Sequence, residues 1–359
     1  VPAIIREVAA LNPDYPILIQ TALARLARDM ETDQPIPLID PLSPDYEQWT
    51  VSYAPYAGDT WLNTDWFFAE IYGYRLLMQI VRWWETGRDP FAPQKVTELG
   101  SPELWERVEA ALLLAEKPYA ERLLGLVHSA LWGNRMDLSY HASQSHGTKS
   151  ADDDLLVDDA AVVRHLLDQS GDIHLIVDNT GTELAMDLAL ADAWLEGAAN
   201  RVIIHPKMHP TFVSDATASD ILMLIEKIRA QTGSATRHFG DRLHQAFEAG
   251  RLRIAPDFYW NSTRLLWDMP PHLVKVFQTA SLVIIKGDAN YRRMVGDILW
   301  PPETPFASVT DYFPAPLLAL RTLKSDLVVG LQPGLVEHLD LTDVHWRTNG
   351  RRGLIQFRP

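Results

Sequence analysis

Cysteine is absent from the 359 residues of this sequence. Disulfide bonds, zinc sites built from thiolates and cysteine nucleophiles are therefore excluded. Positive charge is also scarce, because 32 lysine and arginine residues stand against 47 aspartate and glutamate residues, which gives a formal net charge of -15. Nucleic acids and anionic membrane surfaces are held by surplus basic residues, so this composition argues against both as partners.

Long hydrophobic runs are missing as well. No segment approaches the roughly 18 apolar residues that a membrane-spanning helix requires, and residues 1–7 lack a basic stretch followed by a continuous apolar segment. We therefore expect a cytoplasmic protein that does not act at a membrane. At about 150 residues per domain, the length of the chain suggests two domains.

Two sequence patterns meet near residue 145. Before it, apolar residues recur at the three- and four-residue spacing of amphipathic helices in four segments, 17–30, 66–84, 102–116 and 119–131. After it, short apolar runs alternate with helical patterns, which predicts a parallel sheet covered by helices on both faces. We expect an all-helical N-terminal domain over residues 1–145. Residues 146–359 should form an α/β domain, a three-layer α/β/α sandwich with a mainly parallel, Rossmann-like sheet.

Four of the short apolar runs are each followed by a cluster of charged or amide side chains. The runs cover residues 173–177, 202–204, 282–285 and 317–320. A weaker strand is predicted at 252–255, and residues 327–329 are predicted to form a final strand pair with 317–320. In open α/β sheets, ligands bind outside the carboxyl ends of the strands, so these polar clusters are candidates for a binding site. The first clusters are acidic and the later ones basic, which suits a metal ion that holds an anion.

Oxygen ligands for a metal ion follow the first two of these runs. Asp178 and Asn179 come directly after residue 177, and Asp215 is the candidate for a third ligand from another strand. Carboxylate and amide oxygens favour a hard divalent cation that keeps several waters, so Mg²⁺ or Mn²⁺ fits better than Zn²⁺. The alternative is structural, because Asp178 and Asn179 can form a turn and Asp215 can cap the helix that follows it.

Cations that could hold an anion follow the later runs. Lys286 comes directly after the third run, and the helix that begins near Asn290 carries Arg292 in its first turn. Backbone donors at a helix start, next to these cations, form a site for phosphate or carboxylate. Arg321 and Lys324 follow the last run. A structural ion pair between Lys324 and a nearby aspartate is the alternative.

The segment from Asp178 to Thr182 also resembles the first motif of haloacid-dehalogenase-type phosphatases. In that motif a nucleophilic aspartate is followed two positions later by a second aspartate, which acts as acid and base. Here Thr180 occupies the second position. The similarity is superficial, and a haloacid-dehalogenase-like phosphatase is the alternative interpretation of these residues.

Several motifs occur together, in order, along nearly the whole chain, and they are more specific in combination than any one alone. They are Trp66-Phe67-Phe68-Ala69-Glu70, Leu131-Trp132-Gly133-Asn134-Arg135-Met136-Asp137, Asp178-Asn179-Thr180-Gly181-Thr182-Glu183, Phe212-Val213-Ser214-Asp215, Lys286-Gly287-Asp288-Ala289-Asn290-Tyr291-Arg292, Arg321-Thr322-Leu323-Lys324 and Gly353-Leu354-Ile355-Gln356-Phe357. On these motifs the sequence resembles the damage-control phosphatases, formerly domain of unknown function 89. The similarity is to the subfamily that includes the so-called acidic-residue methyltransferases, which the Arg-Thr-x-Lys motif marks and which is associated with sugar phosphates.

The resemblance implies a metal-dependent phosphatase that hydrolyses phosphate monoesters of small metabolites, typically sugar phosphates such as fructose 1-phosphate. Its cofactor would be a divalent metal ion, Mn²⁺, Co²⁺, Ni²⁺ or Mg²⁺. By position, the resemblance makes Asp178, Asn179 and Asp215 the metal ligands. The residues that it assigns to the substrate pocket are Glu183, Asp288, Asn290, Tyr291, Arg292 and Lys324.

Phosphoryl transfer depends mainly on positioning and on neutralising the charge of the transferred group. We therefore expect Asp178, Lys324 and Arg292 to be the catalytic residues, and leave open whether Asp178 attacks phosphorus or only anchors the metal ion. The helical half should form one wall of the cleft. Its candidates for contacts with sugar hydroxyl groups are Glu70, Arg75, Asn134 and Asp137.

Two other functions are compatible with the same residues. Methyl transfer from S-adenosylmethionine to carboxylates follows from the label of some relatives, although no glycine-rich loop follows the first strand of an α/β unit and methyl transfer needs no divalent cation. A noncatalytic sugar-phosphate-binding protein would keep the same pocket. We expect a small phosphorylated metabolite as the partner, and the sequence indicates no protein partner.

Overall fold

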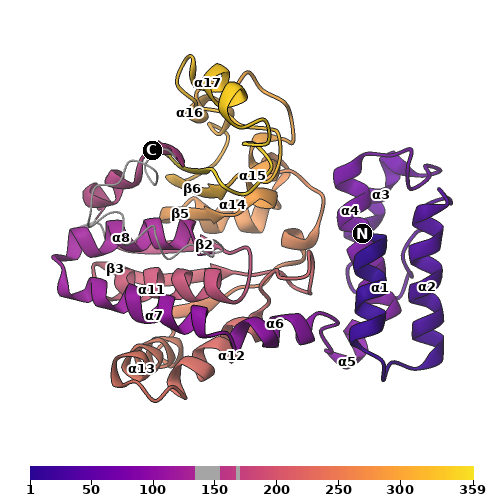
Figure 1. The fold of residues 1–359 in the computed structure, drawn as a ribbon, viewed down its shortest axis with the longest axis horizontal. Helices are drawn as coiled ribbons and strands as arrows, with labels where there is room; N and C mark the ends of the chain where they lie inside the picture. Colours follow the sequence, from indigo (N-terminus) through magenta and orange to yellow (C-terminus); the bar gives the residue numbers. More distant parts are fainter. Residues whose placement is uncertain (134–153, 167–169) are drawn as a thin grey trace.

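The computed structural model describes residues 1–133, 154–166 and 170–359 (Figure 1). Within these ranges a seven-stranded sheet with the order β1-β7-β6-β5-β2-β3-β4 forms the centre of the larger part of the molecule. Its strands are β1 (Leu155–Asp158), β2 (Gly171–Ile176), β3 (Ala199–His205), β4 (Leu252–Ile254), β5 (Ala280–Lys286), β6 (Leu317–Thr322) and β7 (Gly353–Arg358).

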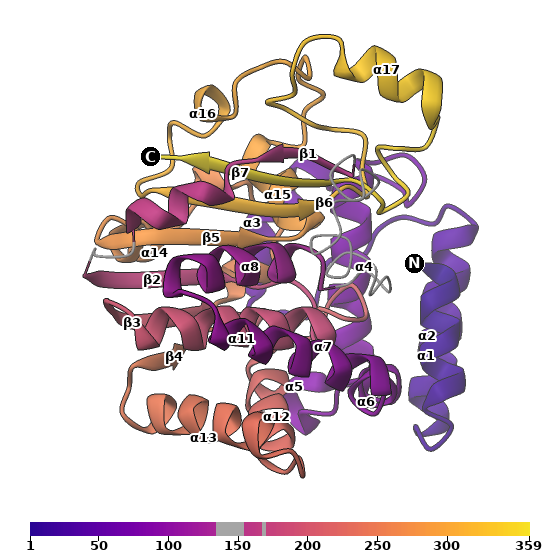
Figure 2. The same ribbon diagram turned by 60° about the vertical axis from the view of Figure 1, so that its left-hand side comes forward.

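The strands that precede the predicted polar clusters all run in one direction. Strands β6, β5, β2, β3 and β4 pair in parallel, whereas β7 pairs antiparallel with β6 and β1 pairs in parallel with β7 (Figure 2). The carboxyl ends of β2, β3, β5 and β6 therefore lie along the same edge of the sheet. This edge, hereafter the carboxyl edge, is where the polar clusters meet.

One predicted strand is wrong. Residues 327–329 form no strand, although Val328 and Val329 are buried. They pack in the core beside β7, where the side-chain amide of Gln356 donates to the carbonyl of Val329 at 2.7 Å. The last strand is β7, which the apolar pattern did not single out.

Side chains of each central strand alternate between two hydrophobic clusters. On β5, Leu282 and Ile284 belong to the first cluster, and Val283 and Ile285 to the second. The first face of the sheet is covered by α7 (Pro102–Leu113), α8 (Tyr119–Leu131), η3 (Ala160–Leu166), α11 (Thr182–Glu196), α12 (Ala218–Arg229) and α13 (Ser234–Glu248). The second face is covered by η4 (Phe258–Asn261), η5 (Leu266–Asp268), α14 (Pro271–Phe277), α15 (Asp288–Val295), α16 (Phe306–Val309) and α17 (Leu335–Thr342). The predicted three-layer α/β architecture with a mainly parallel sheet is confirmed.

A third hydrophobic cluster lies within the N-terminal helices, which stand beside the sheet (Figure 1). These helices are α1 (Pro2–Leu11), α2 (Ile17–Glu31), α3 (Tyr46–Tyr53), η1 (Ala54–Tyr56), α4 (Trp66–Ile80) and α5 (Trp83–Thr86), and α6 (Ala92–Leu99) and η2 (Leu114–Glu116) follow them. The predicted domain boundary near residue 145 lies outside the described residues and stays a prediction. Among the described residues, the hydrophobic clusters change between Phe91 and Leu99, so α7 and α8 share their core with the sheet.

Helix α11 carries the first polar cluster into the centre of the fold. It is buried from Thr182 to Leu195, as expected for a helix between a sheet and further helices, although it carries Glu183, Asp187 and Asp192. Its first amide, from Thr182, donates to Glu98 Oε1 at 2.9 Å. A Cβ atom at Gly181 would lie 2.0 Å from the same oxygen, so this contact requires glycine. The start of α11 is thereby fixed at the carboxyl edge.

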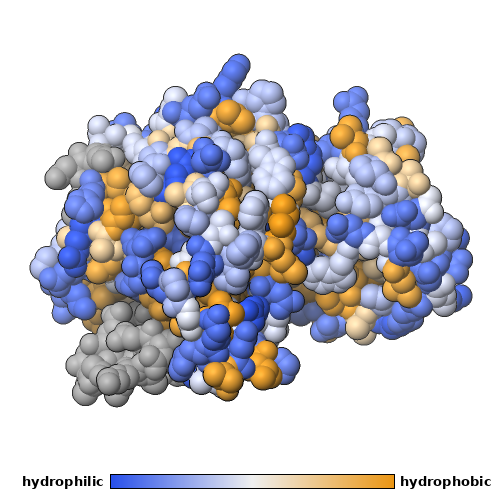
Figure 3. Space-filling model, turned by 90° about the horizontal axis from the view of Figure 1, so that it is seen from above, coloured by the Kyte–Doolittle hydropathy of each residue, from blue (hydrophilic) through white to orange (hydrophobic). Residues whose placement is uncertain are grey.

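None of the described helices has both the length and the apolar composition that crossing a bilayer requires. Seen from above, apolar side chains are dispersed among hydrophilic ones over this face of the molecule (Figure 3).

Candidate active site

The three predicted metal ligands lie together at the carboxyl edge. Asp178 and Asn179 follow β2, and Asp215 lies in the loop between β3 and α12. The amide of Ala216 donates to the carbonyl of Asp178 at 2.8 Å, and Asn179 and Asp215 form an isolated antiparallel bridge. Two segments that are far apart in the sequence are thus joined through their backbones.

Hydrogen bonds fix the orientation of the Asn179 side chain. Its Nδ2 donates to Asp178 Oδ2 at 3.1 Å and to Glu183 Oε2 at 3.0 Å. Its Oδ1 accepts from the hydroxyl group of Ser214 at 2.6 Å. Because a carbonyl oxygen has two lone pairs, Oδ1 keeps one for a further ligand.

Negative charge is concentrated around Asp178. Burial raises the pKa of this carboxyl well above its usual range, and the charges of Asp215 and Glu183 raise it further, while Lys207 and Lys324 act in the opposite direction. Burial also raises the pKa of Asp215, against the lowering effect of Lys207. A divalent cation between the two carboxylates would relieve their repulsion.

The donor atoms fit a hard cation. Among the described residues, no group of three or more histidine, cysteine, aspartate and glutamate side chains could hold a metal ion. The set Asp178, Asn179 and Asp215 combines two carboxylates with one amide, so an ion held there would take one protein ligand from Asn179. Such an all-oxygen set suits Mg²⁺ or Mn²⁺, which keep several waters.

The turn after β5 approaches the carboxylate of Asp178. Gly287 has a φ of +85°, and a Cβ atom there would lie 1.9 Å from Asp178 Oδ2. Only glycine allows this backbone conformation and this contact together. The segment that carries Asp288 and Asn290 is thereby brought against the acidic cluster.

Asp288 ties the Arg-Thr-x-Lys segment to α15. Its Oδ1 accepts from Arg321 Nε at 2.8 Å, from the amide of Lys324 at 3.1 Å and from the hydroxyl group of Ser325 at 3.1 Å. Burial alone would raise the pKa of Asp288, but Arg321 and the hydrogen bonds outweigh it and the pKa is lowered. Asp288 therefore positions the segment that carries Lys324.

Lys324 is exposed, and its side chain forms no ion pair with any described residue. The alternative of a structural ion pair with Asp288 or Asp326 is thus absent from this part of the chain. The charge of Lys324 lowers the pKa of Asp178, which places the two groups within electrostatic reach of each other. Lys324 is free to meet an anion.

Arg292 points toward the N-terminal helices. Its Nε and Nη2 donate to the Asp297 carboxylate at 2.6 and 2.9 Å. Its guanidinium group lies 4.5 Å from the ring centre of Phe67 and 4.8 Å from that of Trp66, both on α4. Binding of phosphate by Arg292 would compete with Asp297.

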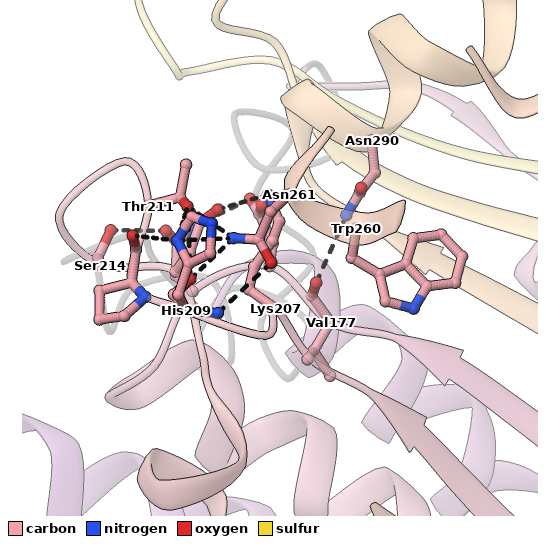
Figure 4. A network of polar contacts seen from close by, with 12 residues as sticks. Val177, Lys207, His209, Thr211, Ser214, Trp260, Asn261 and Asn290 are labelled. Carbon is pink, nitrogen blue, oxygen red and sulfur yellow. Dashed lines mark hydrogen bonds and ion pairs between the residues drawn. The ribbon is translucent and has the colours of Figure 1, made fainter. Parts of the chain in front are cut away.

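Tyr291 and Asn290, which precede Arg292 on α15, make different contacts. Tyr291 is buried in the second cluster, where its hydroxyl group donates to Gln356 at 2.8 Å, so it supports the core instead of facing a ligand. Asn290 Nδ2 donates to the carbonyl oxygens of Lys286 and Val177 at 3.0 and 3.4 Å (Figure 4). The buried Oδ1 of Asn290 has no hydrogen-bond partner among the described residues and remains available to a ligand.

Lys286 is not available to an anionic ligand, because carboxylates of the protein surround it. It is buried, and its Nζ lies 2.7 Å from Glu183 Oε1, 3.1 Å from Asp187 Oδ1 and 2.5 Å from the carbonyl of Ala130. Burial and the charge of Glu183 raise the pKa of Asp187 to about 7, against the lowering effect of Lys286. Glu183 therefore links Lys286, through one carboxylate oxygen, to Asn179, through the other.

A further cation, Lys207, lies beside Asp215 and was not predicted from the sequence. Lys207 Nζ lies 2.7 Å from Asp215 Oδ2, both side chains are buried, and the ring of Phe212 lies 5.4 Å from the same nitrogen. From α6, Lys95 donates to the carbonyl of Asp215 at 3.0 Å. Lys207 follows a buried strand by two residues, and that position was the signal that could have identified it.

The loop that carries Asp215 is anchored and strained. Asn261 Nδ2 donates to the carbonyl of His209 and to the hydroxyl group of Thr211, both at 2.8 Å (Figure 4). Phe212 and Val213 have φ angles of +49° and +68°. A β-branched residue rarely adopts this region, and such strain clusters at functional sites.

Four predicted contacts with the substrate come from the N-terminal half of the chain. Asn134 and Asp137 lie outside the described residues. Arg75 is fully buried and donates twice to Asp45, at 2.6 Å in both cases, so it supports the helical core. Glu70, on α4, forms no hydrogen bond or ion pair with the described residues.

The fold and the site together define an α/β protein with an acidic, oxygen-rich cluster and an exposed lysine, Lys324, at the carboxyl edge of a mainly parallel sheet. The family description "Damage-control phosphatase ARMT1-like domain" matches residues 16–339. The chain belongs to this family, and the resemblance of its motifs is confirmed. Phosphatase chemistry is the activity that the family name states.

Individual relatives agree with this membership. The chain is 30% identical over 376 residues to the damage-control phosphatase ARMT1 of Mus musculus, covering 93% of this chain and 85% of the relative. It is 29% identical over 377 residues to the protein of the same name from Danio rerio, covering 93% and 84%. A crystal structure of a DUF89 family protein from Pyrococcus horikoshii superposes with a TM-score of 0.50 over 99% of this chain and 95% of that one; at 16% identity it supports the fold alone.

Proposed function

We propose that this chain is a metal-dependent phosphomonoesterase that hydrolyses phosphate esters of small metabolites, with sugar phosphates such as fructose 1-phosphate as substrates. The observation that carries the proposal is the convergence of Asp178, Asn179 and Asp215 beside Lys324. Family membership supports the phosphatase activity. The metal ion and the class of substrate are inferred from the donor atoms and from the Arg-Thr-x-Lys motif.

The residues divide the chemistry among them. Asp178, Asn179 and Asp215 would hold the divalent ion, which when bound supplies a Lewis acid for the phosphoryl oxygens. Three hydrogen bonds, with Asp178, Glu183 and Ser214, fix the side chain of Asn179, so little reorganisation is needed on binding. Lys324 offers positive charge to the transferred group, and water is the final acceptor.

A screen of metals against substrates tests the proposal. Mn²⁺, Co²⁺, Ni²⁺ and Mg²⁺ are combined with fructose 1-phosphate and with p-nitrophenyl phosphate, and released phosphate is measured. We expect turnover that EDTA abolishes. Asp178→Asn and Asp215→Asn should each lower kcat/KM by at least about 100-fold, because each removes a charged ligand of the metal ion.

Asp326→Asn is the matched control, because Asp326 is an exposed carboxylate two residues beyond Lys324. It should retain normal kinetics. Phosphate release that survives EDTA, or that is unchanged in both site variants, would refute metal-dependent hydrolysis at this site. Rapid quench of the wild-type reaction separates the two roles of Asp178, since an acyl phosphate forms only if this carboxylate attacks phosphorus.

A further inference from the structure

Helix α4 contacts the sheet part of the molecule at two points, one helical turn to either side of Glu70. At its start, Trp66 and Phe67 flank the guanidinium group of Arg292, which belongs to α15. Further along, the ring of Tyr74 lies 5.2 Å from that of Phe212, in the loop that carries Asp215. Residues three and four apart share one face of a helix, so this face of α4 is turned toward the site.

Glu70 is the acidic residue in the middle of that face. It is partly buried and has no hydrogen-bond or ion-pair partner among the described residues. Burial raises the pKa of Glu70, Arg292 and the N-terminal amino group of Val1 lower it, and Asp215 and Asp288 raise it, in keeping with a position between α15 and the acidic cluster. A partly buried carboxylate without a hydrogen-bond donor is unfavourable, so a ligand that donates hydrogen bonds to Glu70 would stabilise it.

We propose that Glu70 is the specificity-determining residue for the alcohol part of the substrate, accepting hydrogen bonds from its hydroxyl groups. An ionised carboxylate can only accept hydrogen bonds, and it repels a phosphate group. Its partner must therefore be the part of the ester that lies away from the phosphorus. The inference rests on the proposed phosphatase activity and narrows it to esters of sugars and other polyols, at the expense of esters whose leaving group has no hydroxyl group.

The test compares two substrates that share a phosphate group and differ in hydroxyl groups. In Glu70→Gln, the ratio of kcat/KM for fructose 1-phosphate to that for p-nitrophenyl phosphate should fall at least about tenfold, because a buried acceptor for hydroxyl groups is lost. The fall should reside mainly in KM for the sugar phosphate. Inhibition of p-nitrophenyl phosphate hydrolysis by free fructose should weaken in parallel, which reports binding apart from turnover of the sugar ester.

Glu47→Gln serves as the matched control, since Glu47 is an exposed carboxylate on α3 of the same helical region. It should leave the substrate ratio unchanged. The thermal midpoint of Glu70→Gln should stay within about 2 °C of the wild type or rise, since the substitution breaks no hydrogen bond with the described residues and removes a partly buried charge. A clear fall in the midpoint would identify a structural role and overturn the assignment.

The outcomes distinguish this inference from the proposed function. Wild-type protein that hydrolyses neither ester with any of the metal ions would refute the phosphatase proposal itself. Wild-type protein that hydrolyses both, with a substrate ratio in Glu70→Gln altered by less than about twofold, would overturn only the assignment of Glu70. A tenfold fall with an unchanged midpoint would support both.

Discussion

At the scale of single residues, most charges at the carboxyl edge are neutralised in pairs. The pairs are Lys207 with Asp215, Lys286 with Glu183 and Asp187, Arg292 with Asp297, and Arg321 with Asp288. Lys324 differs from these cations, because its side chain has no such partner in the described part of the chain. The pairs hold the geometry, and Lys324 is left to neutralise charge that arrives with a ligand.

The ion pair of Lys207 and Asp215 gives a prediction about stability. Lys207→Met should lower the free energy of unfolding by about 3 kcal/mol, because it leaves a buried carboxylate without its counter-charge. Urea denaturation of the metal-free protein measures the change. In the Lys207→Met background, Asp215→Asn should be much less destabilising than in the wild type, since the two residues act on one interaction.

Lys324→Met is the matched control for this experiment. Lys324 is exposed and has no ion-pair partner among the described residues, so its replacement should change the free energy of unfolding by less than about 0.5 kcal/mol. Equal costs for the two lysine variants would show that the contact between Lys207 and Asp215 contributes nothing to the fold.

The sequence identified which residue types gather at the carboxyl edge but not which of them are already neutralised. Lys207 and Lys286 both follow buried strands, as a ligand-binding cation would. The acids that neutralise Lys286 come from α11, about 100 residues earlier in the chain, and no local pattern reveals that contact. Asp178, Asn179 and Asp215 could be grouped because parallel strands bring their ends to one edge.

At the scale of elements, the turn formed by Phe212 and Val213 holds Asp215 in place at the cost of backbone strain. Both residues have positive φ angles, and both pack against the hydrophobic cluster of the N-terminal helices. The turn therefore links that cluster to the loop of the site. Asn261 secures the loop on its other side.

The strain predicts an unusual order of stability at position 213. Val213→Gly should be more stable than Val213→Ala by about 1 kcal/mol, because both variants lose the same packing but only glycine relieves the positive φ angle. Thermal or urea unfolding measures the difference. At a position with negative φ the order is reversed, so an alanine variant as stable as the glycine variant would argue against strain.

Strands could be predicted where a short apolar run marks them, but not where a strand forms because a neighbouring strand offers its edge for pairing. The runs at β2, β3, β5 and β6 are short and apolar, as buried parallel strands are. β7 begins at Gly353, contains Gln356 and ends at Arg358, and it forms because its backbone pairs antiparallel with β6. Residues 327–329 are equally apolar, but both edges of the neighbouring β7 are already paired, with β1 and β6, so these residues serve as core.

At the scale of the whole molecule, the sheet separates two hydrophobic clusters, and the N-terminal helices contain a third. The helical pattern of residues 102–131 looks the same as that of the earlier helices, because periodicity shows which face of a helix is apolar but not which core that face joins. The sequence therefore predicted α7 and α8 as helices without revealing that they cover the sheet.

Buried histidines make the stability of the whole fold depend on pH. His174 Nδ1 and His205 Nε2 lie 2.9 Å apart; burial lowers the pKa of His174 to about 4, and burial together with His174 lowers that of His205 to about 3. Between pH 6.5 and these values the unfolded chain binds more protons than the folded protein. The stabilisation that is present at pH 7 is therefore lost as the pH falls.

We expect the free energy of unfolding to decrease by at least about 1 kcal/mol between pH 7 and pH 5, since protonating either ring favours the unfolded chain. Urea titrations at intermediate pH values measure the slope. His205→Phe, whose ring can pack against Trp260 and Phe277, should flatten the slope, whereas replacing the exposed His238 by glutamine should not. A slope that is unchanged in His205→Phe would mean that other groups cause it.

Lys95 joins the N-terminal helices to the loop that carries Asp215. This buried lysine lies 2.8 Å from both Asp89 and Asp220, and it also donates to the carbonyl of Asp215. It stands at the joint where the chain passes from the helices to the sheet. If the helices swing outward to admit a large ester, either the lysine leaves both carboxylates or it pulls the backbone of Asp215 along. Widening of the entrance and a change in the position or the contacts of Asp215 would then occur together.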